Sequence, residues 1–393
     1  MTDRSTYICY AKRTPIGKMG GAFAKMAAPK LAATLVKDAS EATGLRPSDI
    51  DEIVMGQVLT AGVGQAPARQ AAIYGGLGDG VCATTINRVC GSGIKSVMLA
   101  DQAIRLGDAE VVFAGGMESM TMAPHLLPGA RAGYRFGSQV VQDHMQHDGL
   151  WDPYDDMAMG NCGEICAKEY GFTREDQDGY ARGSYERARS AWEKGYFSEE
   201  VLPVTVKNRK GDLIVDKDEE PFSVDLDKLS GLRPAFEKDG TVTAGNASSI
   251  NDGAALTVIA GGDAVKKFGL KPIAKIVAQA SYAHAPKMFT TAPIGSIRKV
   301  LDKADLQVSD IDLWEINEAF AVVPMAAIKD LGLSRDSVNV YGGAVSMGHP
   351  IGCSGTRILV TLLNALRREQ KSRGLATLCI GGGEASAVVV EMV

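Results

Sequence analysis

The sequence predicts an α/β protein in which two similar units flank a segment of different character. Three short segments of the N-terminal region return in the same order near the C-terminus, at offsets of 261, 262 and about 266 residues. In both copies, strand-like apolar runs alternate with helical patterns, which is typical of mostly buried sheets flanked by helices. Between the copies, residues from about 120 to 248 are rich in charges, aromatic side chains and turn residues. The repeat therefore indicates a duplicated unit and the middle segment an insertion.

The repeated segments indicate where the units lie. They are 45–51 with 306–312, Ser92-Gly93 with Ser354-Gly355 and the helical pattern after each, and 115–119 with 382–386. A chain of 393 residues is long enough to form more than one core. We therefore predict an N-terminal domain of residues 1–120 plus 249–271, an inserted loop domain of residues 121–248, and a C-terminal domain of residues 272–393.

Composition narrows the classes of function. Hydrophobic residues make up 45% of the chain and charged residues 23%, with a formal net charge of −5, so nothing indicates binding to nucleic acid. No run approaches the roughly 20 apolar residues that span a bilayer. The seven scattered cysteines and an N-terminus without the pattern of a signal peptide favour a reducing compartment, the cytoplasm. We expect a globular protein that acts on small molecules.

The stretch 87–100 places a thiol where a strand is expected to turn into a helix. Residues 83–86 are small or β-branched, and apolar residues recur at helical spacing after Gly93. Unpaired amides and the positive end of the helix dipole would favour the thiolate of Cys90 and make it a nucleophile near neutral pH. A lone cysteine is more often a small buried hydrophobe, so this interpretation depends on residues that could assist Cys90.

His349 is the histidine best placed to assist Cys90. It lies in a glycine-rich loop, 342–355, which Pro350 stiffens and which ends at a predicted helix. Because this loop is the counterpart of the Cys90 turn in the second copy, His349 could reach Cys90 across the duplication and take its proton. The alternative is a loop histidine bonded to the backbone.

Two further residues could act in the same cleft. Cys379 ends an apolar strand just before three glycines whose bare amides could face a ligand oxygen, so it could be a second catalytic thiol. Asn317 follows a strand-like run and could point its amide into the cleft, although such an Asn is more commonly a helix N-cap.

Other cysteines and histidines receive a structural interpretation. Cys162 and Cys166 lie one helical turn apart and are expected to pack in the core, because no other Cys or His pair has the spacing of metal ligands. His144 and His147 lie in a polar segment without a convincing ligand set, and we expect them at the surface. No metal site is predicted.

Taken together, the segments around Cys90, 317–320, 342–355 and 379–383 resemble the thiolase family. The resemblance runs from about residue 14 to the C-terminus, and four motifs in the family's order make it specific. Within the family the chain is most similar to acetyl-CoA acetyltransferases. The resemblance implies a thiolase fold, with two similar α/β domains in a five-layer α-β-α-β-α core, an inserted loop domain that binds coenzyme A (CoA), and a homotetramer built as a dimer of dimers.

The resemblance also implies roles for individual residues. Cys90 is expected to accept the acyl group, His349 to activate it, and Cys379 to act as acid and base on the carbon of the second substrate. Asn317 is expected to hold a water that forms one oxyanion hole with His349, while the amides of Cys90 and Gly381 form the other. Residues expected to contact CoA are Met159, Phe236, Ala244, Ser248, Ala319 and Phe320, and Phe289 is expected to form a wall of the substrate pocket.

The expected function is that of an acyltransferase that interconverts two acetyl-CoA with acetoacetyl-CoA plus CoA, by Claisen condensation and thiolysis through acetyl-Cys90. Such chemistry needs a thioester-forming nucleophile, a base for a methyl proton, and donors aimed at two oxyanions. CoA would be substrate and product, with no permanently bound cofactor.

Three alternatives remain open at this point. A broader 3-ketoacyl-CoA thiolase of fatty-acid β-oxidation would use the same residues on longer chains. A non-catalytic acyl-CoA-binding scaffold is disfavoured because the four polar candidates are all present. A hydrolase or a ketoacyl-synthase-like Cys–His enzyme is the third; its synthase form would need a second histidine where this chain has Cys379.

Overall fold

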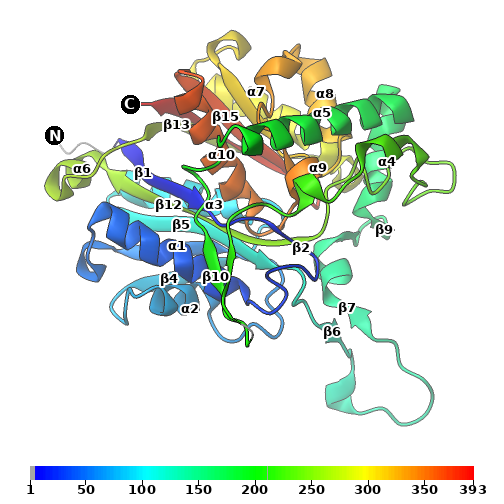
Figure 1. The fold of residues 1–393 in the computed structure, drawn as a ribbon, viewed down its shortest axis with the longest axis horizontal. Coiled ribbons are helices and arrows are strands. Elements are labelled where there is room, and N and C mark those ends of the chain that lie inside the picture. The colour runs from blue at the N-terminus through cyan, green and yellow to red at the C-terminus, as the bar shows by residue number, and fades with distance from the viewer. Residues whose placement is uncertain (1–4, 210) are drawn as a thin grey trace.

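Two helices form the central layer of the computed structural model, which describes residues 5–209 and 211–393 (Figure 1). α3 (Ser92–Leu106) and α10 (Ser354–Arg368) pack against each other and against a sheet on either side. Beyond the first sheet lie α1 (Ala28–Thr43) and α2 (Pro67–Tyr74), and beyond the second lie α7 (Ala292–Ala304) and α8 (Val322–Leu331). The expected five-layer arrangement of two similar α/β units is confirmed.

The two sheets have related topologies. The first has the strand order β4 (Cys82–Ile86), β3 (Glu52–Gly56), β5 (Val111–Ser119), β12 (Asn251–Gly261), β1 (Thr6–Arg13), with β2 (Gly17–Lys18) beside β12. The second has the order β14 (Leu313–Ile316), β15 (Arg373–Ile380), β16 (Glu384–Met392), β13 (Ala274–Ala283). β3 runs parallel to β5, as β14 does to β15, and the sheets join where β1 pairs antiparallel with β13.

The sequence patterns account for these elements. Every residue of β5 is buried, as expected for an apolar run covered by helices on both faces. In α10 the residues from Ser354 to Leu366 are all buried, because this helix lies between the two sheets and packs against α3.

One of the three repeat matches is wrong in structural terms. The matches at offsets of 261 and 262 join equivalent elements, the turns before β3 and β14 and the starts of α3 and α10. Residues 115–119, however, lie inside β5, whereas Gly382 and Gly383 form the turn between β15 and β16 with positive φ values of 90° and 86°. The glycine pair lies in a strand in the first unit and in a turn in the second. The similar composition of the two segments therefore does not identify structurally equivalent positions.

Glycines let the two central helices touch at their N-terminal ends. A Cβ on Gly93 would lie 2.7 Å from the backbone nitrogen of Thr356, and a Cβ on Gly355 would lie 2.3 Å from that of Ile94. Thr356 Oγ1 also donates a hydrogen bond to the Gly93 carbonyl, at 2.8 Å. Because each helix begins just after a candidate motif, this contact brings the Cys90 turn and the His349 loop together.

The segment between β5 and β12 extends over the outside of the two units. It contains α4 (Met159–Tyr170), the long α5 (Arg174–Glu193) and an antiparallel hairpin of β10 (Val204–Val206) and β11 (Leu213–Val215). The sequence Lys-Gly-Asp at 210–212 predicts the turn of that hairpin, but Lys210 lies outside the described residues. Arg13 of β1 ties the segment to the core, since its buried guanidinium binds Asp218 at 2.7 Å and Glu200 at 2.6 Å.

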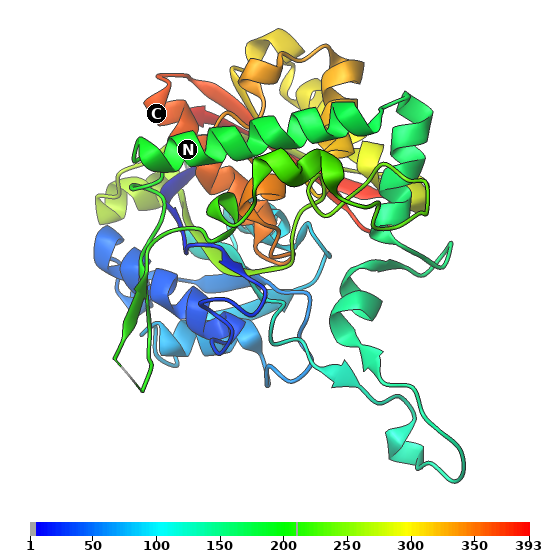
Figure 2. The ribbon, with the colours of Figure 1, turned by 45° about the vertical axis from the view of Figure 1, so that its right-hand side comes forward.

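An arm projects from this segment at lower right in Figure 2. The short strands β6 (His125–Leu126) and β7 (Gln142–Asp143) pair at its base, and residues 127–141 between them are exposed throughout. Within the described residues, no helix combines the length and the apolar character that crossing a membrane requires.

Shorter elements complete the fold. They are β8 (Trp151–Asp152), β9 (Met157–Ala158), α6 (Gly262–Phe268) and α9 (Ala344–Met347). Of these, α9 positions the site most directly, because it ends two residues before His349.

Candidate active site

A cavity of about 250 Å³ holds both Cys90 and His349. Six residues expected at CoA or in the substrate pocket line it with them: Met159, Phe236, Ser248, Phe289, Ala319 and Phe320. The remaining lining residues are Met120, Gly149, Leu150, Gly160, Ala247, Ser249, Ile250 and Ile351. Ala244 is not among them and is exposed, so the structure does not bring this residue to the cavity. Cys379, Asn317 and Gly381 lie behind or beside the lining residues.

A strained turn holds Cys90 in the cavity. The preceding Val89 has φ of +44°, a left-handed conformation that is an outlier for a β-branched residue and costs about 1–3 kcal/mol. Its amide donates to Asn87 Oδ1 at 2.9 Å, and its carbonyl accepts from Ser92 Oγ at 2.7 Å. Arg88 pins the turn to the second unit through Glu384, with Nη2 and Oε2 2.7 Å apart.

Burial controls the protonation of Cys90 in this structure. It raises the pKa of the thiol to about 11, even though the amides of Gly381 and of Cys90 itself hydrogen-bond the sulfur and act in the opposite direction. The prediction that the helix start would favour the thiolate near neutral pH is therefore wrong for the protein without substrate. The two amides nevertheless flank the sulfur, where an oxygen on an attached acyl carbon would lie.

His349 presents a free nitrogen to the same cavity. Its backbone amide donates to Asn251 Oδ1 at 2.9 Å, and its Nδ1 lies 2.6 Å from Ser354 Oγ. Because the Ser354 hydroxyl also donates to the Pro350 carbonyl at 3.0 Å, Ser354 Oγ accepts from Nδ1–H and leaves the lone pair on Nε2. Nε2 has no partner within the described chain. Burial, and secondarily the charge of Arg357, lowers the pKa of His349 to about 3, so the imidazole is neutral.

Cys379 lies at the end of β15 and is fully buried. Burial first, and the neighbouring Cys90 thiol second, raise its pKa well above the ordinary range. Its neighbour Ile380 packs against the Cys90 turn so closely that a Cβ on Gly91 would lie 2.3 Å from Ile380 Cδ1. The structure thus brings the two thiols and Gly381 together.

Asn317 directly follows β14 and is buried, and it is not an N-cap because α8 begins at Val322 after Ala321. Its Oδ1 accepts from Arg357 Nη2 at 3.5 Å, and its Nδ2 has no partner in the described chain. An amide donor is therefore available on the candidate-site side of the second sheet.

Aromatic side chains from both the insertion and the second unit form the cavity wall. Phe320 packs edge-on against Phe236 and Phe289, with ring centroids 6.1 and 6.4 Å apart. A Cβ on Gly160 would lie 2.2 Å from the Phe236 ring, so glycine is needed for this packing. Ser248 adds a hydroxyl that donates to the Ala319 carbonyl at 3.0 Å.

The other cysteines and histidines behave mostly as expected. Cys162 and Cys166 are buried in a hydrophobic cluster. His147 is exposed, but the expectation of a surface position is wrong for His144, which is buried between Asp148 and the Ala61 amide. No group of three potential metal ligands occurs within residues 5–209 and 211–393.

Sequence reasoning missed Glu118, a fully buried carboxylate at the end of β5. It accepts hydrogen bonds from the amides of Val58, Leu59 and Gly352, at 3.0, 3.2 and 3.0 Å, and so ties the first unit to the loop that follows His349. Burial raises its pKa to about 7. The sequence does indicate this residue, because a glutamate inside a run of small and apolar residues is unusual unless its carboxylate has buried partners.

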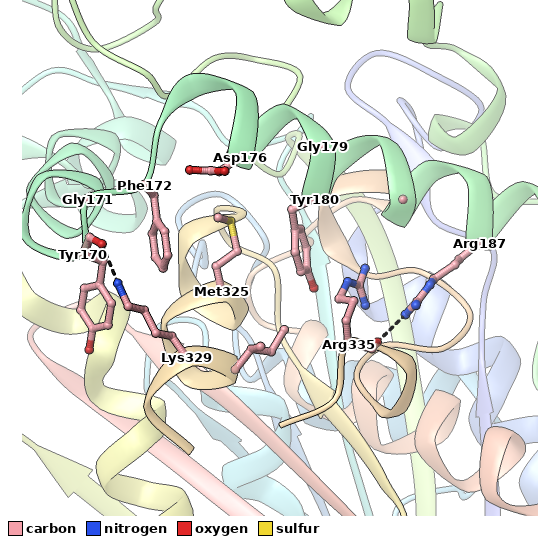
Figure 3. A pocket seen from close by; sticks show the side chains of 12 residues that line it. Tyr170, Gly171, Phe172, Asp176, Gly179, Tyr180, Arg187, Met325, Lys329 and Arg335 are labelled. Atoms are coloured by element: carbon pink, nitrogen blue, oxygen red, sulfur yellow. Dashed lines mark hydrogen bonds between the residues drawn. The ribbon is translucent and has the colours of Figure 1, made fainter. Parts of the chain in front are cut away.

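A second cavity, of about 640 Å³, lies between α5 and α8 (Figure 3). Two of its three cations face aromatic rings: Lys329 Nζ is 5.5 Å from the centroid of Phe172, and Arg335 Cζ is 4.2 Å from that of Tyr180. Lys329 also donates to the Tyr170 carbonyl at 2.9 Å. These cations are engaged by the chain itself, and none of the candidate catalytic residues lines this cavity, so the smaller cavity at Cys90 is the candidate active site.

Comparison with known proteins shows the family of the chain. The family described as "Thiolase, N-terminal domain" matches residues 6–263, and "Thiolase, C-terminal domain" matches residues 270–392. The chain is 50% identical to the acetyl-CoA acetyltransferase of Cupriavidus necator over 393 residues, all of both chains. It is also 50% identical to that of Yarrowia lipolytica, over 99% of this chain and 97% of the relative.

Solved structures agree with the sequence comparison. The acetyl-CoA acetyltransferase of Bacillus anthracis superposes with a TM-score of 0.97 at 40% identity, covering all of both chains. The Acat5 thiolase of Ascaris suum in complex with coenzyme A superposes with a TM-score of 0.94 at 43% identity, covering 99% of this chain and all of the other. The resemblance seen in the motifs is confirmed over the whole length, and the chain belongs to the thiolase family.

Proposed function

We propose that the protein is an acetyl-CoA acetyltransferase that interconverts two acetyl-CoA with acetoacetyl-CoA plus CoA. The observation that carries the proposal is that a cavity-facing thiol, Cys90, shares its cavity with the unpartnered Nε2 of a neutral histidine, His349, while a second thiol lies beside it. Relatives named as acetyl-CoA acetyltransferases, at 50% identity over the full chain, support the same activity.

The first half-reaction forms an acyl-enzyme. His349 Nε2 takes the proton of Cys90 as the sulfur attacks the thioester carbonyl of acetyl-CoA. The amides of Cys90 and Gly381, which already flank the sulfur, stabilise the oxyanion of the resulting tetrahedral intermediate. When the intermediate collapses, the departing CoA sulfur takes the proton of Cys379, His349 keeps the proton that it received on Nε2, and acetyl-Cys90 remains.

The second half-reaction joins two carbons. Cys379 takes a proton from the methyl carbon of a second acetyl-CoA, and the enolate attacks the carbonyl carbon of acetyl-Cys90. The Cys90 thiolate leaves, and acetoacetyl-CoA forms. Donors from Asn317, through a bound water, and from His349 stabilise the enolate oxygen. Thiolysis is the reverse sequence, so the same residues serve both directions.

The insertion and the second unit supply the binding surface for CoA. Met159, Phe236, Ser248, Ala319 and Phe320 present an apolar wall with one hydroxyl, which suits the thin, mostly uncharged pantetheine arm. Phe289 closes the wall nearer the acyl group. CoA acts here as substrate and product, with no permanently bound cofactor.

We further propose a homotetramer, a dimer of dimers, in the cytoplasm. The projecting arm of residues 127–141 supports self-association, because Phe136 is 100% exposed and Val140 79% exposed, and large exposed apolar side chains mark interaction sites. Seven free cysteines suit a reducing compartment. Light scattering after size exclusion tests the tetramer, and a monomer at micromolar concentration would contradict it.

The chain-length profile of thiolysis tests the proposed activity. Acetoacetyl-CoA should be cleaved efficiently, with kcat/KM falling as the 3-ketoacyl chain lengthens, because the aromatic wall around Phe289 is already closely packed. Efficient cleavage of chains of about ten carbons would instead favour the broader 3-ketoacyl-CoA thiolase of β-oxidation. A control with Phe289→Ala should improve the longer chains relative to acetoacetyl-CoA, by about one order of magnitude at most.

A further inference from the structure

A buried ion pair lies directly behind the candidate site. Arg357, in the first turn of α10, is 1% exposed, and Glu315, in β14, is 2% exposed. Arg357 Nη1 lies 3.5 Å from Glu315 Oε2. Removing charges from water is costly: burial raises the pKa of Glu315 to about 8, although the facing guanidinium of Arg357 acts in the opposite direction. A cation near the N-terminal end of a helix also opposes the helix dipole. Packing alone therefore does not explain why Arg357 is buried at this position.

Unpartnered polar atoms are concentrated around this pair. Ten buried side-chain nitrogen or oxygen atoms of the described residues have no hydrogen-bond partner. Five of the ten belong to four neighbouring side chains. Two of them, Glu315 Oε2 and Arg357 Nη1, face each other at 3.5 Å without hydrogen-bond geometry, and the other three are Asn317 Nδ2, His349 Nε2 and Arg357 Nε. Buried polar groups are nearly always satisfied in folded proteins, and the exceptions gather where a protein acts. The pair therefore belongs with the candidate site.

The chemistry of the guanidinium determines how Asn317 is oriented. Arginine has five N–H donors and no acceptor, so only the oxygen of a neighbouring amide can face it. Arg357 Nη2 lies 3.5 Å from Asn317 Oδ1, a long contact that favours this orientation and leaves the NH₂ group directed away from the guanidinium. A flipped amide would set two donors against each other in a buried place, where an unmatched donor costs about 1–3 kcal/mol.

We infer that Arg357, held by Glu315, is a positioning residue that orients the Asn317 amide so that its NH₂ group serves the reaction. This role rests on the proposed function, in which Asn317 supports an oxyanion. Arg357 itself touches no reacting atom. Its charge also adds to the burial that keeps His349 neutral, consistent with a place behind both groups.

A double-mutant cycle tests the inference. Asn317→Ala should lower kcat for thiolysis of acetoacetyl-CoA by about 10²–10³-fold, as for loss of one oxyanion donor. Arg357→Lys keeps the charge but not the planar fork, and should lower kcat by about tenfold to hundredfold with KM unchanged. In the Asn317→Ala background, Arg357→Lys should change kcat by less than about twofold, because its effect passes through the missing amide.

Arg13→Lys is the matched control. Arg13 is also fully buried and paired with two carboxylates, but it has no contact with the cavity. It should lower thermal stability and change kcat by the same factor in the wild-type and Asn317→Ala backgrounds. A merely structural role for Arg357 would give this additive pattern too.

Glu315→Gln provides a second variant should Arg357→Lys fail to fold. It leaves the guanidinium in place but removes the carboxylate that faces it above a pH of about 8. Assayed above that pH, Glu315→Gln should lower kcat in the wild-type background and hardly change it in Asn317→Ala. The wild-type protein could turn over its substrates while the losses of kcat in both variants add to that of Asn317→Ala. That result would overturn the role of Arg357 and leave the proposed function standing. A wild-type protein that neither condenses acetyl-CoA nor cleaves acetoacetyl-CoA would overturn the proposed function, and this role with it.

Discussion

Each of the two α/β units has a turn that leads into a central helix, after strand β4 in the first unit and after the short helix α9 in the second, but the two turns are used differently. α3 and α10 begin at Ser92 and Ser354, so the positions two residues earlier are Cys90 and Gly352. In the first unit this position carries a thiol that faces the cavity. In the second it carries no side chain, and its amide donates to Glu118 at 3.0 Å. Duplication thus provided the turn twice, and only one copy carries a nucleophile.

The two thiols of the site also differ, in their access to the cavity. Cys90 is 8% exposed and lines the cavity, whereas Cys379 is fully buried. Burial raises the pKa of both, and the Cys90 thiol raises that of Cys379 further. Acetylation of Cys90 removes a group that can become negative, and therefore removes this last contribution. Cys379 then becomes easier to ionise at the stage when the proposed mechanism needs a base.

Replacing Cys90 with Ala should give the largest effect. Condensation and thiolysis should both fall by at least about 10⁴-fold, because the thiol that accepts the acetyl group in both directions is lost. In wild type, incubation with acetyl-CoA, quenching and peptide mass spectrometry should find the acetyl group on Cys90. An acetyl group on Cys379 would reverse the assignment of the two thiols.

Replacing Cys379 with Ala should separate the half-reactions. Condensation and thiolysis should fall by about 10²–10⁴-fold, since each passes through an enolate whose proton Cys379 takes or gives. Acetylation of Cys90 should persist, because it requires mainly His349 and the amides beside the sulfur. Some slowing is acceptable, as Cys379 could protonate the departing CoA. Complete loss of acetylation in a folded variant would show that the thiols do not divide the work in this way.

Local sequence predicted the elements better than it predicted their electrostatics. The strand and helix patterns, and the motifs at Cys90 and His349, follow from short-range periodicity and glycine placement, and the structure contains them. The raised pKa of Cys90 depends instead on its burial, to which chain almost 300 residues away in the sequence contributes, as where Ile380 packs against Gly91. No property of residues 87–100 could reveal it.

Other features could not be predicted from the sequence for the same reason, because they depend on contacts between distant parts of the chain. Arg357 and Glu118 are charged residues inside apolar elements, and their importance emerges only when their buried partners are known. Similarly, Ala244 lies in a run of small residues beside Ser248, but the chain turns so that Ala244 is exposed and Ser248 faces the cavity. The domain boundaries and the roles of the site residues stay predictions.

Among the tests of the comparison between the two thiols, the protonation state of Cys90 has the smallest expected effect. A pKa of about 11 means that the thiolate fraction, and with it the thiolate-dependent rate of alkylation by iodoacetamide, rises about tenfold per pH unit between pH 6 and 9. In wild type, neutral His349 offers a second route by taking the proton during attack. Because its pKa is about 3, this route does not vary over the same range.

His349→Ala should therefore slow alkylation most at pH 6, with the ratio of wild-type to variant rates shrinking as the pH rises and the thiolate route takes over. Ultraviolet difference spectra against Cys90→Ala distinguish this from a preformed thiolate–imidazolium pair. With the burial seen here, thiolate absorbance is absent at pH 7 and appears as the pH approaches about 11. A thiolate signal already present at neutral pH would mean that the helix start outweighs burial after all. A rate ratio that is unity at every pH would remove His349 from the role of base, and Cys90 would then need another proton acceptor.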